Sequence, residues 1–204
     1  MKEKSAKDYR SLNKEKIRSE FLRLRNSLSK DFILESSAEI FAKAQSLENY
    51  KSAKTVMFYL SCGSEVFTDD MIKAALKSGR RVAVPAITNL EKSEMEAVEI
   101  SKIQDADKII LGIRQPDIKN AVKISKDEID FIAAPGLVFD IMGFRIGYGK
   151  GFFDRWLREV DKNKTVGLAY DFQIIDKICR DENDKCVGNV ISEKRILAVP
   201  KKEF

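Results

Sequence analysis

The chain has 204 residues, of which 44% are hydrophobic, and this is enough for one domain with a buried core. Lys and Arg (37) nearly balance Asp and Glu (32), so the net charge of +5 gives no strong indication of nucleic-acid binding. The absence of histidine excludes Ser-His-Asp triads, Cys-His dyads and His-ligated zinc sites. Any general acid or base must therefore be a carboxylate, Lys, Tyr or Cys.

Cysteine usage and hydropathy bear on the cellular compartment. Cys62, Cys179 and Cys186 are odd in number and form no metal-spaced cluster. The first residues are polar and charged, and no apolar run has the length of a signal peptide or a membrane span. We therefore expect a cytoplasmic protein that has no membrane partner.

Apolar spacing predicts two helices near the beginning of the chain. Apolar residues recur at steps of three and four over residues 17–28, which indicates a first helix with Lys14 and Arg18 on one face. Ser29 or Asp31 is placed to cap a second helix. On spacing alone, Lys14 and Arg18 are either a phosphate clamp or solvated charges.

The order of elements that follows is typical of an α/β fold. Residues 55–61 (TVMFYLS) are a β-branched and aromatic run that predicts a buried strand. A helix capped by Thr68 is expected to end at Gly79, and the next strand, 81–84, is expected to stop at Pro85. Strand, helix and strand in this order indicate a βαβ unit.

Several short segments complete the predicted architecture. The capping-box pattern of residues 125–128 predicts a short helix. We find no repeat, low-complexity tract or linker, so we expect a single domain over residues 1–204, with an open mixed, largely parallel sheet flanked by helices. Further strands are expected at residues 95–100, 109–111, 130–134, 165–170, 187–191 and 196–199.

Residues 143–151 contain four glycines, too many for regular structure, and residues 152–160 resume as an amphipathic helix. Glycines let backbone N–H groups approach an anion, and the helix N-terminus adds a favourable dipole, to which Arg145 and Lys150 add full charges. The segment is no Walker A motif, because Gly151 follows Lys150, and no dinucleotide fingerprint, because Phe152 replaces the third glycine. A phosphate-binding loop and a surface loop both fit this composition.

Three carboxylates are candidates for the same site. Asp154 lies in the first turn of the helix that follows the glycines, where it either stabilises the helix dipole or holds magnesium. Glu65 follows a predicted strand, at the carboxyl end where parallel sheets usually bind ligands. Asp184 lies in a charged turn before a strand. On spacing alone, an ordinary turn acid is the favoured interpretation of both Glu65 and Asp184.

Two adjacent segments, 134–140 (APGLVFD) and 143–155 (GFRIGYGKGFFDR), closely resemble the signature of the 5-formyltetrahydrofolate cyclo-ligase family. The Lys-x-x-x-Arg of Lys14 and Arg18, the segment 58–68 and the segment 166–173 follow the order found in that family. The resemblance therefore spans nearly the whole chain.

The resemblance implies that the chain uses MgATP to convert 5-formyltetrahydrofolate into 5,10-methenyltetrahydrofolate, with phosphorylation of the formyl oxygen and release of ADP and phosphate. It implies a folate substrate, ATP and Mg²⁺, no nucleic acid, and a monomer. The implied catalytic residues are Arg145 and Lys150. The implied ATP contacts are Lys14, Glu15, Lys16, Ile17, Arg18, Arg145, Ile146, Gly147, Tyr148, Gly149, Lys150, Gly151, Phe152 and Phe153. The implied folate contacts are Leu60, Glu65, Tyr148, Gly149, Lys150, Gly151 and Phe152, and the implied magnesium ligands are Asp154 and Asp184.

The chain departs from the family pattern at a few positions. Phe152 and Phe153 stand where Tyr is frequent, which removes hydroxyl groups but keeps aromatic packing. Gln115 replaces a carboxylate in the segment 112–116 (GIRQP), which puts an acid role at this position in doubt.

Two other classes of protein remain as alternatives: a nucleotide-binding regulator that has lost catalysis, and an RNA-binding protein that uses its basic first helix.

Overall fold

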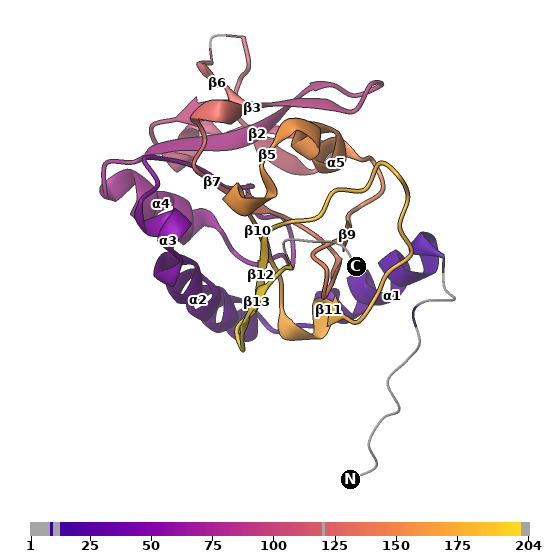
Figure 1. Ribbon diagram of the computed structural model, residues 1–204. Helices are drawn as coiled ribbons and strands as arrows, with labels where there is room; N and C mark the ends of the chain where they lie inside the picture. Colours follow the sequence, from indigo (N-terminus) through magenta and orange to yellow (C-terminus); the bar gives the residue numbers. More distant parts are fainter. Residues whose placement is uncertain (1–8, 10–12, 120, 201–204) are drawn as a thin grey trace.

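The computed structural model describes residues 9, 13–119 and 121–200 (Figure 1). The helices are α1 (Lys14–Asn26), α2 (Lys30–Ser46), α3 (Glu48–Lys51), α4 (Asp69–Lys77) and α5 (Phe152–Trp156), with 3-10 helices η1 (Ile103–Asp105), η2 (Lys126–Glu128), η3 (Leu157–Glu159), η4 (Lys162–Lys164) and η5 (Asp171–Gln173). The strands are β1 (Thr55–Met57), β2 (Arg81–Asn89), β3 (Glu94–Ile100), β4 (Lys108–Ile110), β5 (Ile113–Gln115), β6 (Lys123–Ile124), β7 (Phe131–Ala134), β8 (Val138–Asp140), β9 (Arg145–Ile146), β10 (Thr165–Leu168), β11 (Ile174–Ile175), β12 (Asn189–Ile191) and β13 (Ile196–Ala198).

An eight-stranded sheet forms the centre of the fold, in the order β13-β12-β10-β7-β1-β2-β3-β6. The strands from β12 to β2 in this order are parallel to their neighbours, whereas β13, β3 and β6 pair in the antiparallel sense. A three-stranded sheet, β11-β8-β9, and the hairpin β4-β5 accompany it. The predicted mixed, largely parallel sheet flanked by helices is confirmed.

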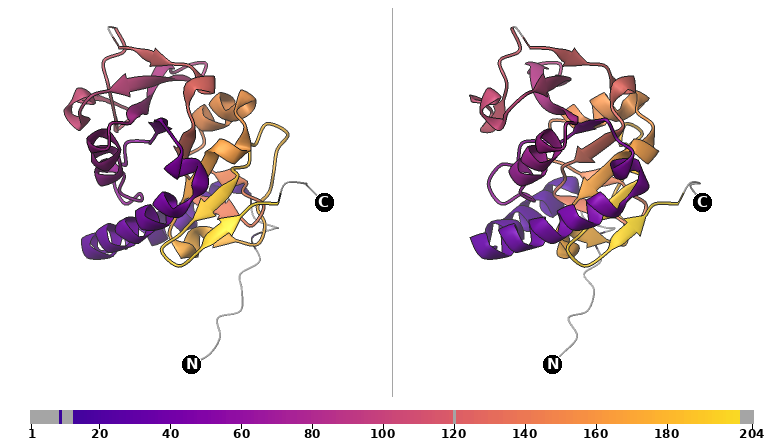
Figure 2. Two further views of the ribbon diagram at one scale, coloured as in Figure 1. Left: turned by 60° about the vertical axis from the view of Figure 1, so that its left-hand side comes forward. Right: turned by 90° about the vertical axis from the view of Figure 1, so that its left-hand side faces the viewer.

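Alternation along the central strands divides the core between the two faces of the sheet. Val56 and Phe58 pack in a cluster with buried residues of α2, α3 and α4, whereas Met57 packs with Trp156 and Leu157 at α5 and η3. Figure 1 shows α2, α3 and α4 on one side of the sheet and α5 on the other. The rotated views of Figure 2 show the same layers, with the yellow strands β12 and β13 at the sheet edge.

Helix α1 packs on the three-stranded sheet, β11-β8-β9. Its apolar residues Ile17 and Phe21 are buried against Leu137, Val138 and other residues around β8 and β9. The helix begins after Asn13, whose side chain accepts a hydrogen bond from the Lys16 N–H at 2.9 Å. The beginning of α1 lies beside residues 147–151, which follow β9 and are called the glycine segment below.

The predicted helix boundaries are largely confirmed, with one change of role. Ser29 caps α2 by accepting a hydrogen bond from the Phe32 N–H. Thr68 directly precedes α4, but its hydroxyl donates to the Tyr59 carbonyl at 2.5 Å and makes no helix cap. Gly79 has a φ of +77°, which ends the segment of α4 as expected.

The prediction that the second strand stops at Pro85 is wrong, because β2 continues to Asn89. The Phe58 N–H donates to the Ala83 carbonyl, so Ala83 faces β1. Residues two apart in a strand direct their backbone groups to the same side, so the Pro85 nitrogen also faces that side, where β1 has already ended. No ladder hydrogen bond is lost there, and the strand tolerates the proline.

Other differences concern lengths. The first strand was expected over 55–61 but β1 ends at Met57, and the helix expected over 152–160 is α5 followed by η3. The strands β5, β6, β8, β9 and β11, of two or three residues each, were not predicted. Within the part of the chain that the structure describes, no helix is both long and apolar enough to cross a membrane.

Candidate active site

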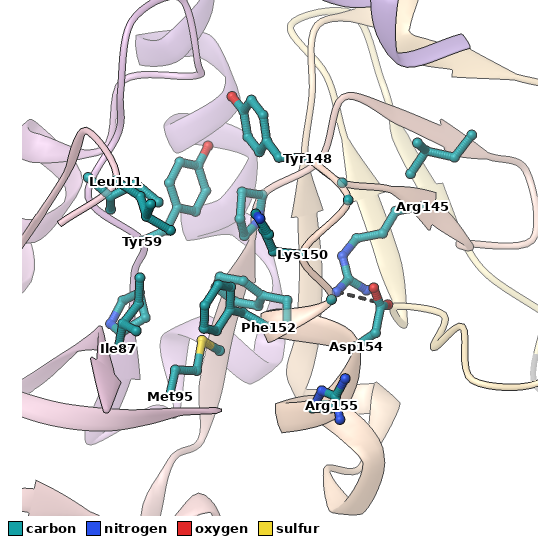
Figure 3. A pocket seen from close by; sticks show the side chains of 18 of the residues that line it. Tyr59, Ile87, Met95, Leu111, Arg145, Tyr148, Lys150, Phe152, Asp154 and Arg155 are labelled. Atoms are coloured by element: carbon teal, nitrogen blue, oxygen red, sulfur yellow. Dashed lines mark ion pairs between the residues drawn. The ribbon is translucent and has the colours of Figure 1, made fainter. Parts of the chain in front are cut away.

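The chain that leaves the carboxyl ends of β1 and β7 lines a cavity of about 610 Å³. One side of the cavity is apolar and the other carries charges, and the glycine segment runs between them (Figure 3). The apolar side includes Leu60, Pro85, Ile87, Met95, Leu111, Ile113 and Phe152. The charged side includes Lys14, Arg18, Arg145, Asp154, Arg155, Arg158, Asp181 and Asp184.

The glycine segment takes conformations that side chains disfavour. Gly149 has a φ of +98° and Gly151, which precedes α5, has a φ of +73°. Helix α1 supports the segment, because the Arg18 Nε donates to the Gly147 carbonyl at 2.9 Å. A Cβ on Gly149 would lie 3.4 Å from the Arg18 guanidinium carbon. The backbone of this segment therefore lies directly on the arginine.

Arg145 is a buried cation at the charged side, with 3% of its surface exposed. Its Nη2 lies 3.1 Å from the Asp154 carboxylate and its Nη1 donates to the Lys185 carbonyl. Burial lowers the pKa of Arg145, and the charge of Asp154 opposes this shift. Arg145 is consequently a fixed, positively charged group below the glycine segment.

Lys14 is held in a similar way by two other carboxylates. Its Nζ lies 2.6 Å from Asp181 and 2.5 Å from Asp184. Burial lowers the pKa of Lys14, but the hydrogen bonds with Asp181 and Asp184 outweigh burial and leave the pKa above its usual value. Lys14 therefore carries its charge throughout the neutral range.

Lys150 differs from these two cations. It is exposed, it lines the cavity, and no carboxylate of the described residues pairs with it. Figure 3 shows it between the apolar side and the Arg145–Asp154 pair. Its charge is therefore available to an anionic ligand at the junction of the two sides.

Glu65 lies at the opposite wall and is 7% exposed. Its Oε2 accepts a hydrogen bond from the Cys62 N–H at 2.9 Å, and its Oε1 accepts from the Tyr148 hydroxyl at 2.7 Å. Burial, followed by the charge of Glu65, raises the pKa of Tyr148. The tyrosine therefore stays protonated and donates to the carboxylate. Leu60, which is 2% exposed, lines the cavity beside it.

The cavity brings together only part of the predicted ATP contacts in α1. Lys14 and Arg18 line it, whereas Glu15 and Lys16 are exposed elsewhere and Ile17 is fully buried in the core. Residues four apart share one face of a helix, and the residues between them point away. Glu15 and Lys16 thus do not line the cavity, and Ile17 lies in the core cluster that includes Phe144 and Ile146.

Asp154 and Asp184, the predicted magnesium ligands, both line the cavity. Each is partly buried and paired with a cation, Arg145 or Lys14. Among the described residues, no group of three or more His, Cys, Asp or Glu side chains is arranged to hold a metal. The site fits an ion that arrives with phosphate, because Mg²⁺ commonly uses one or two carboxylates together with phosphate oxygens.

Sequence reasoning missed several residues of the site. Arg25, in the last turn of α1, is 3% exposed and bonds to Tyr148. Leu111 and Gly112 form the tip of the β4-β5 hairpin with φ values of 53° and 76°, and Leu111 lines the cavity. A Leu-Gly pair between two short apolar runs is a weak hairpin signal that could have been used.

Gln115 has a structural role in this chain. It is 2% exposed, and its Oε1 accepts a hydrogen bond from the Ile87 N–H at 3.0 Å. Ile87 lies on the same side of β2 as Pro85, beyond the end of β1, so the glutamine satisfies a backbone donor that has no strand partner. An acceptor oxygen is sufficient for this contact.

The parallel sheet and the cavity at its carboxyl edge define an α/β protein, and the glycine segment with its cations has the composition that suits an anionic ligand. The profile of the 5-formyltetrahydrofolate cyclo-ligase family matches residues 10–193. The chain belongs to this family of enzymes.

Individual relatives agree with this assignment. The 5-formyltetrahydrofolate cyclo-ligase of Mus musculus is 29% identical over 188 residues, which cover 87% of this chain and 92% of the mouse protein. The Escherichia coli K12 protein of the same name is 28% identical over 148 residues, covering 71% and 80% of the two chains.

Solved structures share the fold. The NMR structure of Aquifex aeolicus 5,10-methenyltetrahydrofolate synthetase superposes with a TM-score of 0.81 at 28% identity, covering 94% of this chain and 95% of that one. A 5,10-methenyltetrahydrofolate synthetase from Mycoplasma pneumoniae gives a TM-score of 0.71 at 22% identity, covering 89% of this chain and 99% of that one, and supports the fold alone.

Proposed function

We propose that this chain catalyses the ATP-dependent cyclisation of 5-formyltetrahydrofolate to 5,10-methenyltetrahydrofolate, with release of ADP and phosphate. The observation that supports this most directly is the division of the cavity into a cationic side and an apolar side that meet at Lys150. Family membership supplies the substrate class, and the divided cavity suits a polyanion beside an aromatic ring system.

ATP is proposed to bind at the cationic side. Lys14, Arg18 and Arg145 line it together with Gly147, Gly149 and Gly151 of the glycine segment. Convergent cations and loop amides are the usual environment of a triphosphate. Glu15, Lys16 and Ile17 would contribute through the helix backbone alone.

The folate is proposed to bind at the apolar side. Leu60, Ile87, Met95 and Phe152 supply flat, water-excluding surface for its ring system. Glu65, whose two oxygens already accept hydrogen bonds, is a carboxylate acceptor for ring N–H donors at the inner wall. Tyr148 to Phe152 would separate the folate from ATP and contact both.

In this reaction the formyl oxygen must first be converted into a leaving group. The formyl oxygen attacks the γ-phosphorus, a new P–O bond forms, and the bond to the β-phosphate oxygen breaks to release ADP. The second folate nitrogen then attacks the formyl carbon and loses its proton to solvent, and the C–O bond breaks to release phosphate. Positioning and charge neutralisation dominate phosphoryl transfer, so no histidine is needed.

The two proposed catalytic cations, Arg145 and Lys150, have different roles in this reaction. Arg145 is buried and fixed by Asp154, so it would hold the phosphates in one place. Lys150 is exposed at the junction and would neutralise the charge that develops on the transferred group. Asp154 and Asp184 would hold Mg²⁺ bound to the phosphates, where the ion supplies further charge neutralisation.

Substitution of Lys150 tests this assignment. With 5-formyltetrahydrofolate and MgATP, we expect the wild-type protein to form methenyl-folate, measured by its absorbance, and Lys150→Ala to lose about 100-fold or more in kcat/KM for ATP. Lys77→Ala is the matched control, because Lys77 is an exposed lysine at the end of α4, outside the cavity.

Two results would overturn the proposal. A wild-type protein that binds ATP but forms no product would be the non-catalytic regulator. A Lys150→Ala variant with wild-type kinetics, beside an active wild type, would remove Lys150 from the chemistry. Unchanged melting temperatures in both variants would show that the fold is intact.

A further inference from the structure

Arg25 is a buried charge that the mechanism above does not use. It lies in the last turn of α1, it is 3% exposed, and it does not line the cavity. Taking a guanidinium out of water is costly unless hydrogen-bond partners replace the water. The identity of these partners therefore indicates what the residue does.

Within the described part of the chain, the side-chain partners of Arg25 belong to the two segments that form the cavity walls. Its Nη2 donates to the Tyr148 hydroxyl, and its guanidinium carbon lies 5.5 Å from the centre of the Tyr148 ring. Its Nε donates to the Ser64 hydroxyl at 3.2 Å, and its Nη1 lies 3.9 Å from the Glu65 carboxylate. Arg25 thus touches the glycine segment and the loop after β1 together.

The contacts form a directed chain of hydrogen bonds. Arg25 donates to the Tyr148 hydroxyl, which in turn donates its proton to Glu65. Tyr148 is two residues before Lys150, and Figure 3 shows its hydroxyl pointing away from that lysine. A shift of the Tyr148 ring would therefore move the backbone that carries Lys150 and would also remove a donor from Glu65.

Helix α1 holds the glycine segment at two places. Arg18 holds it at the Gly147 carbonyl, and Arg25, seven residues later on the same helical face, holds it at the Tyr148 side chain. Only the second contact continues to the opposite wall. The Tyr148 hydroxyl and Glu65, which join the ATP side to the folate side, are thus both in contact with one buried guanidinium.

We infer that Arg25 is a positioning residue that couples the folate-side carboxylate Glu65 to the ATP-side glycine segment through Tyr148. This inference rests on the proposed function, because Glu65 and Lys150 are placed there at different substrates. It predicts that one substitution, at a residue outside the cavity, weakens the use of both substrates.

The test uses Arg25→Met, Tyr148→Phe and the double variant, with Arg23→Met as the matched control. Arg23 is an exposed arginine in the same turn of α1. We expect Arg25→Met and Tyr148→Phe each to raise the KM for ATP and the KM for 5-formyltetrahydrofolate about tenfold, and Arg23→Met to match the wild type. The double variant should be no worse than the more damaged single variant, because both break the same chain.

Arg25→Lys separates positioning from simple charge compensation. Lysine keeps the charge but lacks the planar fork that reaches Tyr148 and Ser64 together. We expect Arg25→Lys to have a higher melting temperature than Arg25→Met, close to that of the wild type. Its KM values for ATP and for 5-formyltetrahydrofolate should nevertheless stay raised.

Three outcomes overturn the inference. The first is an Arg25→Met variant with wild-type KM values, and the second is a pair of single effects that multiply in the double variant. The third, which holds even if Arg25→Met does not fold, is a Tyr148→Phe variant whose KM for 5-formyltetrahydrofolate is unchanged. An inactive wild type would instead refute the proposed function, and the inference with it, so the two failures are distinguishable.

Discussion

At the scale of single residues, some cations of the site are paired with carboxylates and one is not. Lys14 and Arg145 are held by aspartates at 2.5–3.1 Å, whereas Lys150 has no carboxylate partner among the described residues. The glycine-rich segment predicted Arg145 and Lys150 as cations near phosphate, whereas only the family resemblance predicted this for Lys14. The sequence could not predict the pairing, because Asp181 and Asp184 are far from Lys14 along the chain.

Buried tyrosines lead to a prediction about alkaline pH. Tyr170 is fully buried and its hydroxyl donates to the Glu65 carbonyl at 3.1 Å. Burial raises its pKa from 10.0 to about 12. Because the folded-state pKa is the higher one, this contribution to the free energy of unfolding is complete below pH 10 and is lost as the pH rises towards 12.

The comparison with Tyr170→Phe isolates this contribution. Between pH 10 and 12 the free energy of unfolding of the wild type should fall more steeply than that of the variant, by about 1.4 kcal/mol per pH unit for one proton. Denaturant titrations at a series of pH values measure both slopes. Parallel curves for the two proteins would contradict the assignment to Tyr170.

At the scale of elements, α1 and the glycine segment form one unit. The apolar spacing of the sequence predicted α1. The sequence also predicted the glycine segment as a loop, because its glycines are too many for regular structure. Arg25 was not readable as a site residue, because a charged residue in an amphipathic helix normally faces solvent. Its burial results from the packing of α1 on the three-stranded sheet, whose strands β8 and β9 the sequence did not predict.

A pair of alanine substitutions tests the glycine segment. Gly149 has a φ of +98° and lies against Arg18, whereas Gly147 has no positive φ and no atom within 4 Å of an added Cβ. We expect Gly149→Ala to strain the segment by about 1–3 kcal/mol and to raise the KM for ATP. Gly147→Ala should give a smaller increase.

The two variants are compared by steady-state kinetics and thermal unfolding. Equal effects of the two substitutions on the KM for ATP would show that the left-handed conformation at Gly149 is unimportant for the site.

At the scale of the whole molecule, the sheet determines where the chemistry is placed. The loop of Glu65 after β1, the glycine segment after β9 and the chain near Asp184 line one cavity, together with Pro135 after β7. The fold class and the matching segments were predictable, because βαβ order and the family signature are properties of the sequence. Two features depend on where other strands end: the extension of β2 through Pro85, and the β4-β5 hairpin as a wall of the cavity. Local sequence patterns carry no information about the ends of other strands.

The central proposal is that ATP and the formyl group meet in this cavity and that phosphate leaves with the formyl oxygen. The most direct measurement supplies 5-formyltetrahydrofolate labelled with ¹⁸O at the formyl oxygen, together with MgATP, and analyses the released inorganic phosphate by mass spectrometry. We expect methenyl-folate to form only when ATP is present, and one ¹⁸O atom to appear in each phosphate. Product formation without ATP, or phosphate that carries no label, would contradict the proposal.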